Sequence, residues 1–341
     1  MRQSSSSIGF WCKVCLANLM KAIVYRRYGP PDVLKLEEVS KPVPADKEVL
    51  IKVRAASVNP YDWHFMRGEP YLLRVMAGLR QPKETRLGAD VAGHIEAVGK
   101  NVTQFRSGDE VFGCCKGAFA EYACASESKL AAKPQNVTFE QAASVPIAAI
   151  TALQGLRDKG KIQLGHKVLI NGASGGVGTF AVQIAKSFGA HVTAVCSTRN
   201  VQLVQSIGAD RVVDYTQQDF TKTSDRYDIL LDNVGNRSLS ACRRLLHLNG
   251  IYIEAGGTAG RWMIGPLLRA IEKLLLSCFG ARKLVGVFAK VTKEDLTSLG
   301  NLMQSGKLTP VIDRRCSLPE LPEAIRYLEQ GHARAKVVIT V

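Results

Sequence analysis

The chain has 341 residues, of which 46% are hydrophobic, and a formal net charge of +15. A chain of this length and composition buries at least one full core and divides by ordinary domain sizes into about two domains, which excludes a disordered protein. The cations are spread along the chain without a run of five or more, so the charge does not indicate a nucleic-acid-binding surface.

Residues 1–19, MRQSSSSIGFWCKVCLANL, are serine-rich and contain no acidic residue. We expect a disordered extension, and a degenerate targeting peptide, a tail or an over-extended start codon would each fit this composition. Cys12 and Cys15 supply only half of a structural zinc site. The nine cysteines of the chain show no disulfide spacing, which favours free thiols and a cytosolic protein.

Three regions follow the extension. Residues 20–138 are predicted to form an all-β unit, because short apolar runs such as KAIVY, EVLIKVRAASV and GHIEAVG alternate with turn residues. Residues 139–290 alternate helical stretches with β-branched runs, which predicts βαβ units around a parallel sheet. Residues 291–341 contain a predicted helix, 319–330, and end in a strand, AKVVITV.

One apolar stretch, 264–280, resembles a membrane span only in part. Arg269, Glu272 and Lys273 interrupt it, and this is too much charge for a spanning helix, so no stable membrane insertion is expected. Its apolar residues fall on one helical face, which leaves core packing, a homodimer contact and binding to a membrane surface open. The residues of this face are Leu267, Leu268, Ile271, Leu274, Leu275 and Cys278.

The strongest chemical signal is a glycine-rich segment between the predicted strand 167–171 and the predicted helix 177–187. Glycines let the backbone approach a pyrophosphate, and the N–H groups at the helix start bind its charge. The spacing differs from GxGxxG, but the position between a strand and a helix predicts a dinucleotide site. The loop residues predicted to bind the cofactor are Gly172, Ala173, Ser174, Gly175, Gly176, Val177 and Gly178.

The end of the next predicted strand indicates which dinucleotide binds. An NAD site usually has an acidic residue there, which accepts hydrogen bonds from the ribose. This chain has Ser197, Thr198 and Arg199 instead, and hydroxyls with a guanidinium suit the 2′-phosphate of NADP(H). The alternative is that Arg199 is only a solvated charge at a helix start.

Several motifs in this order give the chain a family resemblance. From GPPDVLKLEEV, VNPYDW and GADVAGHIEAVG through NGASGGVG, GADRVVDY and DNVG, residues 21–341 resemble the medium-chain dehydrogenase/reductases, in their zinc-independent quinone oxidoreductase branch that includes zeta-crystallin. The resemblance implies an α/β plus β protein with a GroES-like β-barrel catalytic domain and a Rossmann, doubly wound parallel-sheet cofactor domain. It also implies that residues 291–341 return to the catalytic domain.

The resemblance also bears on metal binding. Zinc-dependent members hold their catalytic metal with cysteine and histidine, and Asn59 and Ala89 stand at two of those positions here. His94 lies in the following strand, where we expect it to face solvent or a neighbouring strand. No metal ligand is therefore assigned, and without a Lewis acid an electron-poor acceptor is the favourable substrate. We expect NADPH-dependent hydride transfer to a quinone or an α,β-unsaturated carbonyl; the alternative is an NADPH-binding structural or regulatory protein with little turnover.

Further site residues come from the resemblance alone. Asn59 and Thr151 stand where the family contacts the nicotinamide and the substrate. Tyr61, His64 and Tyr71 are alternative candidates for the proton donor, and bulk water would serve equally. The remaining residues expected at the cofactor are Tyr215, Asn233, Gly256, Gly257, Phe288 and Lys336. A turn-forming Asn59, a core Phe288 and a solvated Lys336 are the alternatives. Segments 69–84 and 259–279 should flank the cleft, and their apolar residues suggest a lipophilic substrate.

Overall fold

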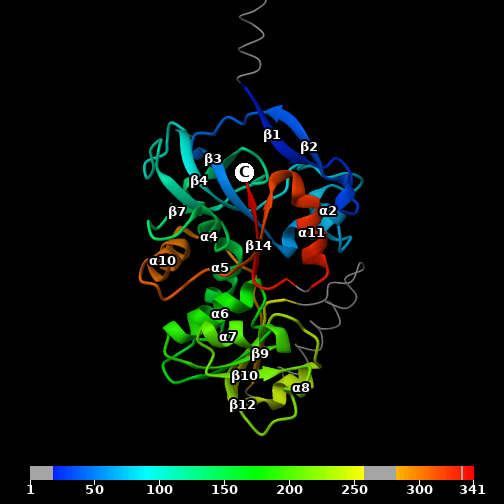
Figure 1. The fold of residues 1–341 in the computed structure, drawn as a ribbon, viewed down its shortest axis with the longest axis vertical. Helices are drawn as coiled ribbons and strands as arrows, with labels where there is room; N and C mark the ends of the chain where they lie inside the picture. Colours follow the sequence, from blue (N-terminus) through cyan, green and yellow to red (C-terminus); the bar gives the residue numbers. More distant parts are fainter. Residues whose placement is uncertain (1–17, 257–281, 332) are drawn as a thin grey trace, which may run out of the picture.

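The protein is described here by a computed structural model, which covers residues 18–256, 282–331 and 333–341. Two sheets dominate it: one formed largely by the first third of the chain together with its last strands, and one formed by the middle (Figure 1). The extension that we predict to be disordered lies almost wholly outside the described residues, as do Gly257 and the stretch 264–280. The three boundaries between the four predicted segments stay predictions.

The first sheet, called the mixed sheet below, has the strand order β14-β15-β3-β4-β5-β7, with β6 paired to β3. Its pairs are antiparallel except β14 with β15, which run parallel. A separate hairpin-like pair, β1 with β2, lies beside it. The strands are β1 Leu19–Val24, β2 Lys35–Ser40, β3 Glu48–Val58, β4 Asp90–Val98, β5 Glu110–Cys114, β6 Tyr122–Ser126, β7 Leu130–Ala132, β14 Ile312–Ser317 and β15 Lys336–Thr340.

The second sheet, called the parallel sheet, has the strand order β10-β9-β8-β11-β12-β13. Every pair in it is parallel, and the order equals 3-2-1-4-5-6 when its strands are numbered along the chain. This is the Rossmann order, in which ligands bind at the carboxyl ends of the strands near the reversal, here between β8 and β11. The strands are β8 Lys167–Asn171, β9 His191–Cys196, β10 Arg211–Asp214, β11 Tyr227–Asp232, β12 Leu246–Glu254 and β13 Lys283–Gly286.

Helices cover the sheets and join them. Helix α6 buries the apolar residues Phe180, Ala181 and Ile184, because their spacing places them on one helical face. Helix α5, nearly all of whose residues are buried, packs against α6 and also contacts strands of the mixed sheet. The helices are α2 Pro60–Arg67, α3 Leu73–Ala77, α4 Phe139–Ala143, α5 Pro146–Gln154, α6 Gly176–Ser187, α7 Val201–Ser206, α8 Leu239–Arg244, α10 Lys293–Gln304 and α11 Leu321–Glu329.

The structure confirms the predicted fold class and shows how the chain returns to its first sheet. Strand β15 pairs antiparallel with β3, so that Val337 lies opposite Val58. The predicted strand GHIEAVG is longer than expected, because β4 begins at Asp90. This extension places Asp90 inside the sheet, opposite Ser57.

Candidate active site

Four polar side chains are buried together where the interior strands β15, β3 and β4 of the mixed sheet end beside α2. We call Asn59, Asp62, Asp90 and Lys336 the polar cluster; each exposes 3% of its surface or less. Burying ionisable groups is costly unless each is paired and hydrogen-bonded. The local contacts of each member show how that condition is met.

Asn59 and Asp62 meet at the start of α2. Asn59 precedes Pro60, which suits the first position of a helix because its fixed φ is helical and it has no N–H to satisfy. The Asp62 carboxylate accepts a hydrogen bond from the Asn59 N–H at 2.8 Å and another from the Gly88 N–H at 3.1 Å. Burial nevertheless raises the Asp62 pKa to about 7.

Asp90 collects hydrogen bonds from three elements. Its Oδ2 accepts from the Ser57 hydroxyl at 2.8 Å and from Asn59 Nδ2 at 2.9 Å. Its Oδ1 accepts from the Ile147 N–H at 3.0 Å, in the first turn of α5, where the helix dipole favours a negative charge. The carboxylate thereby ties α5 to the mixed sheet.

Lys336 completes the polar cluster from β15. Its Nζ donates to Asn59 Oδ1 at 2.6 Å and lies 3.5 Å from Asp90 Oδ2. Burial lowers the Lys336 pKa, while the negative charges of Asp90 and Asp62 oppose that shift. The solvated position considered for Lys336 is wrong, because only 3% of the residue is exposed.

Asn59 has its whole amide occupied. Besides the bond to Asp90, Nδ2 donates to the Ser57 carbonyl at 3.3 Å, and Oδ1 accepts from Lys336. Because an amide nitrogen carries two hydrogens, neither is left for a substrate oxygen in this arrangement. Asn59 is also more than a turn former, since it bridges two charged side chains.

The other two residues assigned to catalysis, Thr151 and Tyr61, differ in how far they are buried. Thr151 on α5 is buried, and its hydroxyl donates to the Ile147 carbonyl at 2.7 Å, one turn earlier. Tyr61 on α2 is 47% exposed and packs against Phe65. Desolvation is the main cause of its raised pKa, so its hydroxyl keeps its proton at neutral pH.

The predicted glycine loop joins β8 to α6 beside Lys336. Gly172 has a φ of 74°, which glycine adopts without strain, and a Cβ on Gly178 would lie 2.1 Å from the Gly172 carbonyl oxygen. A Cβ on Gly176 would lie 3.2 Å from Lys336 Cδ. The Ser174 carbonyl accepts from the Ala335 N–H at 2.8 Å. The loop therefore packs directly on the start of β15.

The start of α6 fits a dinucleotide pyrophosphate. Gly175 is the residue before the helix and provides no side-chain cap, so the first N–H groups of α6 receive no side-chain bond from it. Two buried amide oxygens at the same edge of the parallel sheet, Asn200 Oδ1 and Asn233 Oδ1, also have no hydrogen-bond partner in the described structure. Unsatisfied buried acceptors of this kind suit a ligand that donates hydrogen bonds.

The predicted ribose site lies at the end of β9. Ser197 Oγ and Ser174 Oγ both accept from Asn200 Nδ2, at 3.2 and 2.9 Å, which fixes this edge next to the glycine loop. The Tyr215 N–H donates to the Cys196 carbonyl at 3.0 Å, and Tyr215 is 49% exposed. The structure thus brings the residues of GADRVVDY next to those at 197–199.

Asp214 is an acidic neighbour that sequence reasoning missed. It ends β10, and its pKa is lowered chiefly by a hydrogen bond from Thr198. Thr198 Oγ1 also lies 2.8 Å from Thr216 Oγ1. Because Asp214 reaches Thr198 from the adjacent strand, no pattern within β9 could reveal it.

The remaining predicted cofactor residues lie at different depths. Asn233 follows β11 and donates to the Asn171 carbonyl at 2.9 Å, and a Cβ on Gly256 would lie 2.4 Å from the Asn233 carbonyl oxygen. These two residues therefore pack tightly at the sheet edge. Phe288 is 95% exposed, so the core position considered for it is wrong.

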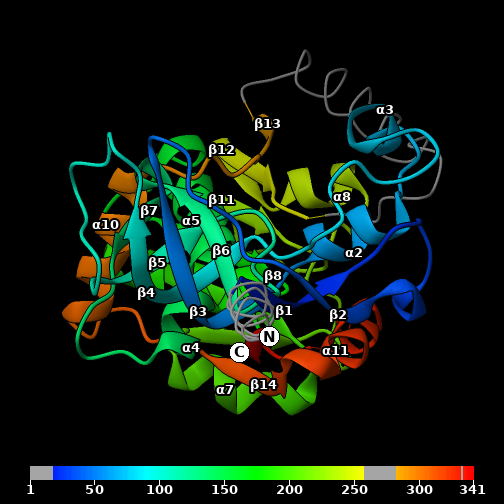
Figure 2. The same ribbon diagram turned by 90° about the horizontal axis from the view of Figure 1, so that it is seen from above.

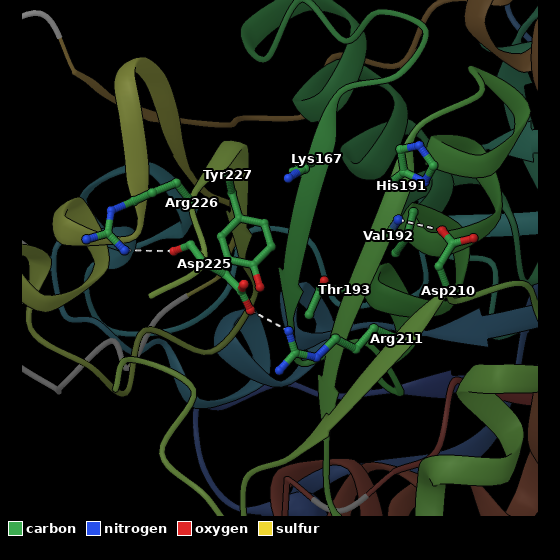
Figure 3. A pocket seen from close by; sticks show the side chains of 9 residues that line it. All are labelled: Lys167, His191, Val192, Thr193, Asp210, Arg211, Asp225, Arg226 and Tyr227. Carbon is green, nitrogen blue, oxygen red and sulfur yellow. Dashed lines mark hydrogen bonds and ion pairs between the residues drawn. The ribbon is translucent and has the colours of Figure 1, made fainter. Parts of the chain in front are cut away.

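A separate cavity of about 210 Å³ opens at the opposite, N-terminal edge of the parallel sheet (Figure 3). Lys167, Thr193 and Tyr227 line it, but none of the predicted site residues does. Its acidic residues already have partners, because Asp225 pairs with Arg211 and Asp210 with Lys186. This cavity is therefore separate from the candidate active site.

The sequence predicts no metal ligand, and His94 lies a few residues after Ala89, which stands at one of the positions where zinc-dependent relatives bind their metal. His94 lies on β4, half-buried against the Phe139 ring of α4 at 4.8 Å between ring centroids, so it contacts a helix, whereas solvent or a neighbouring strand was predicted. Across residues 18–256, 282–331 and 333–341, no group of three or more histidine, cysteine, aspartate or glutamate side chains is arranged to hold a metal ion.

A glycine loop at the reversal point of a Rossmann-order parallel sheet is typical of proteins that bind a dinucleotide. Two family models match the chain: the alcohol dehydrogenase GroES-like domain at residues 45–135 and the zinc-binding dehydrogenase model at 207–339. The chain belongs to the medium-chain dehydrogenase/reductase superfamily, among its quinone oxidoreductase-like members.

Individual relatives support this assignment over almost the whole chain. The mitochondrial NAD(P)H oxidoreductase RTN4IP1 of Mus musculus is 34% identical, over 95% of this chain and 90% of that protein. The 2-methylene-furan-3-one reductase of Solanum lycopersicum is 34% identical, over 96% of this chain and 80% of that protein. The solved quinone oxidoreductase of Coxiella burnetii is 32% identical with a TM-score of 0.82, covering 95% of this chain and 99% of that one.

Proposed function

We propose that this oxidoreductase transfers a hydride from NADPH to a quinone or an α,β-unsaturated carbonyl without a catalytic metal. The observation that carries the proposal is the Lys336 ammonium, buried 2.6 Å from Asn59 Oδ1 while its side chain runs beside Gly176. This places a positive charge in a dry environment at the junction of the glycine loop and the mixed sheet.

The cofactor supplies the hydride when bound, and the protein must stabilise what remains. Hydride addition to an enone or a quinone leaves negative charge on an oxygen atom, which then takes up a proton. A preorganised cation with hydrogen-bond donors stabilises such a charge far better in a dry site than in water. We assign this role to Lys336, because two of its three bonds, to the Val58 carbonyl at 3.4 Å and to Asp90 Oδ2 at 3.5 Å, are long enough to be exchanged for a bond to the substrate oxygen.

Asn59 then acts as a positioning residue. Its Oδ1 accepts from Lys336, and its Nδ2 is held by Asp90, so the amide fixes the direction of the ammonium. Thr151 and Tyr61 keep their proposed places beside the cofactor and the substrate, with the Tyr61 hydroxyl as a candidate proton donor. The polar cluster contains no thiolate or imidazole, and its two carboxylates already accept hydrogen bonds from the protein, which is the chemical basis for proposing a metal-free reaction.

The preference for NADPH rests on the residues after β9. Ser197, Thr198 and Arg199 would bind the 2′-phosphate of NADPH. The loop Gly172–Gly178 and the start of α6 would bind its pyrophosphate. Tyr215, Asn233, Gly256 and Gly257 belong to the same proposed site, with Phe288 at its outer edge. The cytosolic location and a homodimer stay predictions, and the mouse relative is named as mitochondrial.

The decisive experiment measures NADPH consumption by the purified protein with a panel of quinones and 2-alkenals. We expect turnover with at least one acceptor class, and deuterium carried by labelled NADPH should appear on the β-carbon of a reduced enone. Lys336→Met should abolish this turnover while NADPH binding persists. If wild-type protein binds NADPH but consumes it with no acceptor, the binding-protein alternative is correct.

A further inference from the structure

Large apolar side chains project into solvent between α2 and β4. Leu72, Val75, Met76 and Leu79 expose 62%, 62%, 80% and 70% of their surfaces, and we call these four residues the apolar patch. Val75 and Met76 lie on α3, and Leu72 and Leu79 flank it; Figure 2 shows α3 at the periphery of the molecule, away from both sheets. Four large apolar side chains exposed within eight consecutive residues are uncommon on the surface of a soluble domain, so the patch indicates a contact surface.

The segment that carries the apolar patch is firmly attached at its back. Arg74 Nε donates to the Gly68 carbonyl at 3.0 Å, and its guanidinium lies over the Tyr28 ring, 4.5 Å from the centroid. The Tyr28 hydroxyl donates to the Gly78 carbonyl at 2.7 Å. With Arg74 turned toward the protein, the neighbouring Val75 and Met76 are held outward.

Positive charge follows the apolar patch directly. Arg80 and Lys83 are exposed, and neither forms an ion pair with another described residue. The nearby exposed acid, Glu84, is already paired with Lys116 at 3.3 Å. The surface around the patch therefore combines apolar side chains with uncompensated cations, on a chain whose net charge is +15.

We propose that the apolar patch, together with Arg80 and Lys83, binds the protein peripherally to an anionic lipid bilayer. The apolar side chains would enter the boundary between head groups and acyl chains, and the two cations would contact anionic head groups. Within the described residues no helix is long and apolar enough to cross a bilayer.

A bilayer fits this surface better than a protein partner. Stable protein interfaces bury about 800 Å² on each partner and need a matching shape, which four side chains on one short segment do not provide. A bilayer needs no matching shape, and one that contains anionic lipids carries the negative charge that Arg80 and Lys83 would contact. Segment 69–84 is also predicted to flank the cleft, and vesicle binding, which requires no turnover, tests the lipid contact separately from that role.

The test is sedimentation of the full chain with vesicles. Vesicles made of equal parts of phosphatidylcholine and phosphatidylserine should retain the protein, and those of pure phosphatidylcholine should retain much less. Raising the salt from about 0.1 M to about 1 M should weaken binding, since it shortens the screening length. Val75→Ser combined with Met76→Ser should lower the affinity at least about tenfold, because less apolar surface enters the lipid. Arg80→Gln combined with Lys83→Gln should weaken binding to anionic vesicles.

The matched control is Val43→Ser combined with Leu248→Ser, which removes apolar groups that are 87% and 69% exposed elsewhere on the surface. It should bind vesicles as the wild type does, and thermal unfolding should be unchanged in all variants. Equal vesicle binding by the patch variant and the wild type would overturn the proposal. Absence of vesicle binding by the wild type would also overturn the proposal. In that case, a change of oligomeric state in the patch variant would indicate that the patch contacts a second copy of the chain. A change only in the turnover of a soluble quinone would indicate that the patch packs against another part of the same chain.

Discussion

Lys336 and Asn59, 277 residues apart in sequence, are joined by a hydrogen bond of 2.6 Å between Nζ and Oδ1 in the buried interior. Removing the amide would leave the ammonium without its main orienting partner and Asp90 without one of its donors. We therefore expect Asn59→Ala to lower kcat by about 10² to 10³, the usual effect of disturbing a preorganised group in a dry site. Stopped-flow or steady-state assays with a quinone would measure it, and the dissociation constant of NADPH should change little. Asn101→Ala, on an exposed loop, is the control, and unchanged turnover in Asn59→Ala would remove Asn59 from the mechanism.

Cofactor preference should depend on two residues of opposite charge. Arg199→Ala should weaken NADPH binding by about tenfold or more and leave NADH binding nearly unchanged, because only the 2′-phosphate loses a charged partner. Asp214→Asn should strengthen NADPH binding, since it removes a negative charge that bonds to Thr198. Fluorescence titration with both cofactors measures these effects. Equal affinity of the wild type for NADH and NADPH would contradict the assignment.

The Asp62 carboxyl predicts a pH dependence of stability. Burial raises its pKa from 3.8 to about 7, so the folded protein holds this proton more tightly than the unfolded chain does. The stability that Asp62 contributes is therefore complete at low pH and falls as the pH rises from about 4 to about 7, by at most about 1.4 kcal/mol per unit. Urea unfolding of the wild type and Asp62→Asn across this range should show a slope that the variant lacks. Parallel pH profiles of the two proteins would show that Asp62 is ionised throughout.

The glycine loop should tolerate no side chain at Gly178. Gly178→Ala would place a Cβ 2.1 Å from the Gly172 carbonyl oxygen, so the turn must shift and the pyrophosphate site with it. We expect NADPH binding to fall by at least about 10², in line with the cost of displacing positioned groups. Gly155→Ala is the matched control, because its Cβ would meet no atom closer than 3.5 Å. Isothermal titration would compare the two variants, and normal binding by Gly178→Ala would contradict the proposed site.

Metal removal should leave turnover intact. After exhaustive dialysis against a chelator, we expect the wild-type rate of NADPH oxidation to be retained and elemental analysis to find no stoichiometric zinc. The reason is that Asn59 and Ala89 stand where cysteine and histidine ligands would be required. One tightly held zinc ion per chain, with activity lost on its removal and regained on its return, would overturn the metal-free proposal.

The fold was predictable because its signals are local. The strand, glycine loop and helix around Gly172 follow each other within 21 residues, and the hydrophobic periods of these elements match their positions in the structure. Asn59 and Lys336 were recognisable from motifs. Their direct contact was not, because it depends on the antiparallel pairing of β15 with β3.

Asp62, Asp90 and Asp214 show why the rest of the candidate site escaped sequence reasoning. Asp90 lies in a glycine-punctuated run that resembles a turn, and its burial follows only from the extra length of β4 and the arrival of α5. Asp62 resembles an ordinary helix-start acid, and Asp214 acts across two neighbouring strands. In each case the decisive partner comes from another element, and no spacing within one segment encodes that meeting.

The placement of Lys336 on β15 also has a consequence for synthesis on the ribosome. The strands of the parallel sheet and β3 to β7 all precede β15 in the chain, and Asn59, Asp62 and Asp90 are made long before their cationic partner. A nascent chain can thus form its parallel sheet before Lys336 is synthesised, while Asn59, Asp62 and Asp90 still lack their cationic partner. Until β15 pairs with β3, these polar side chains lack their full set of partners, and this part of the chain is open to chaperone binding or to misfolding.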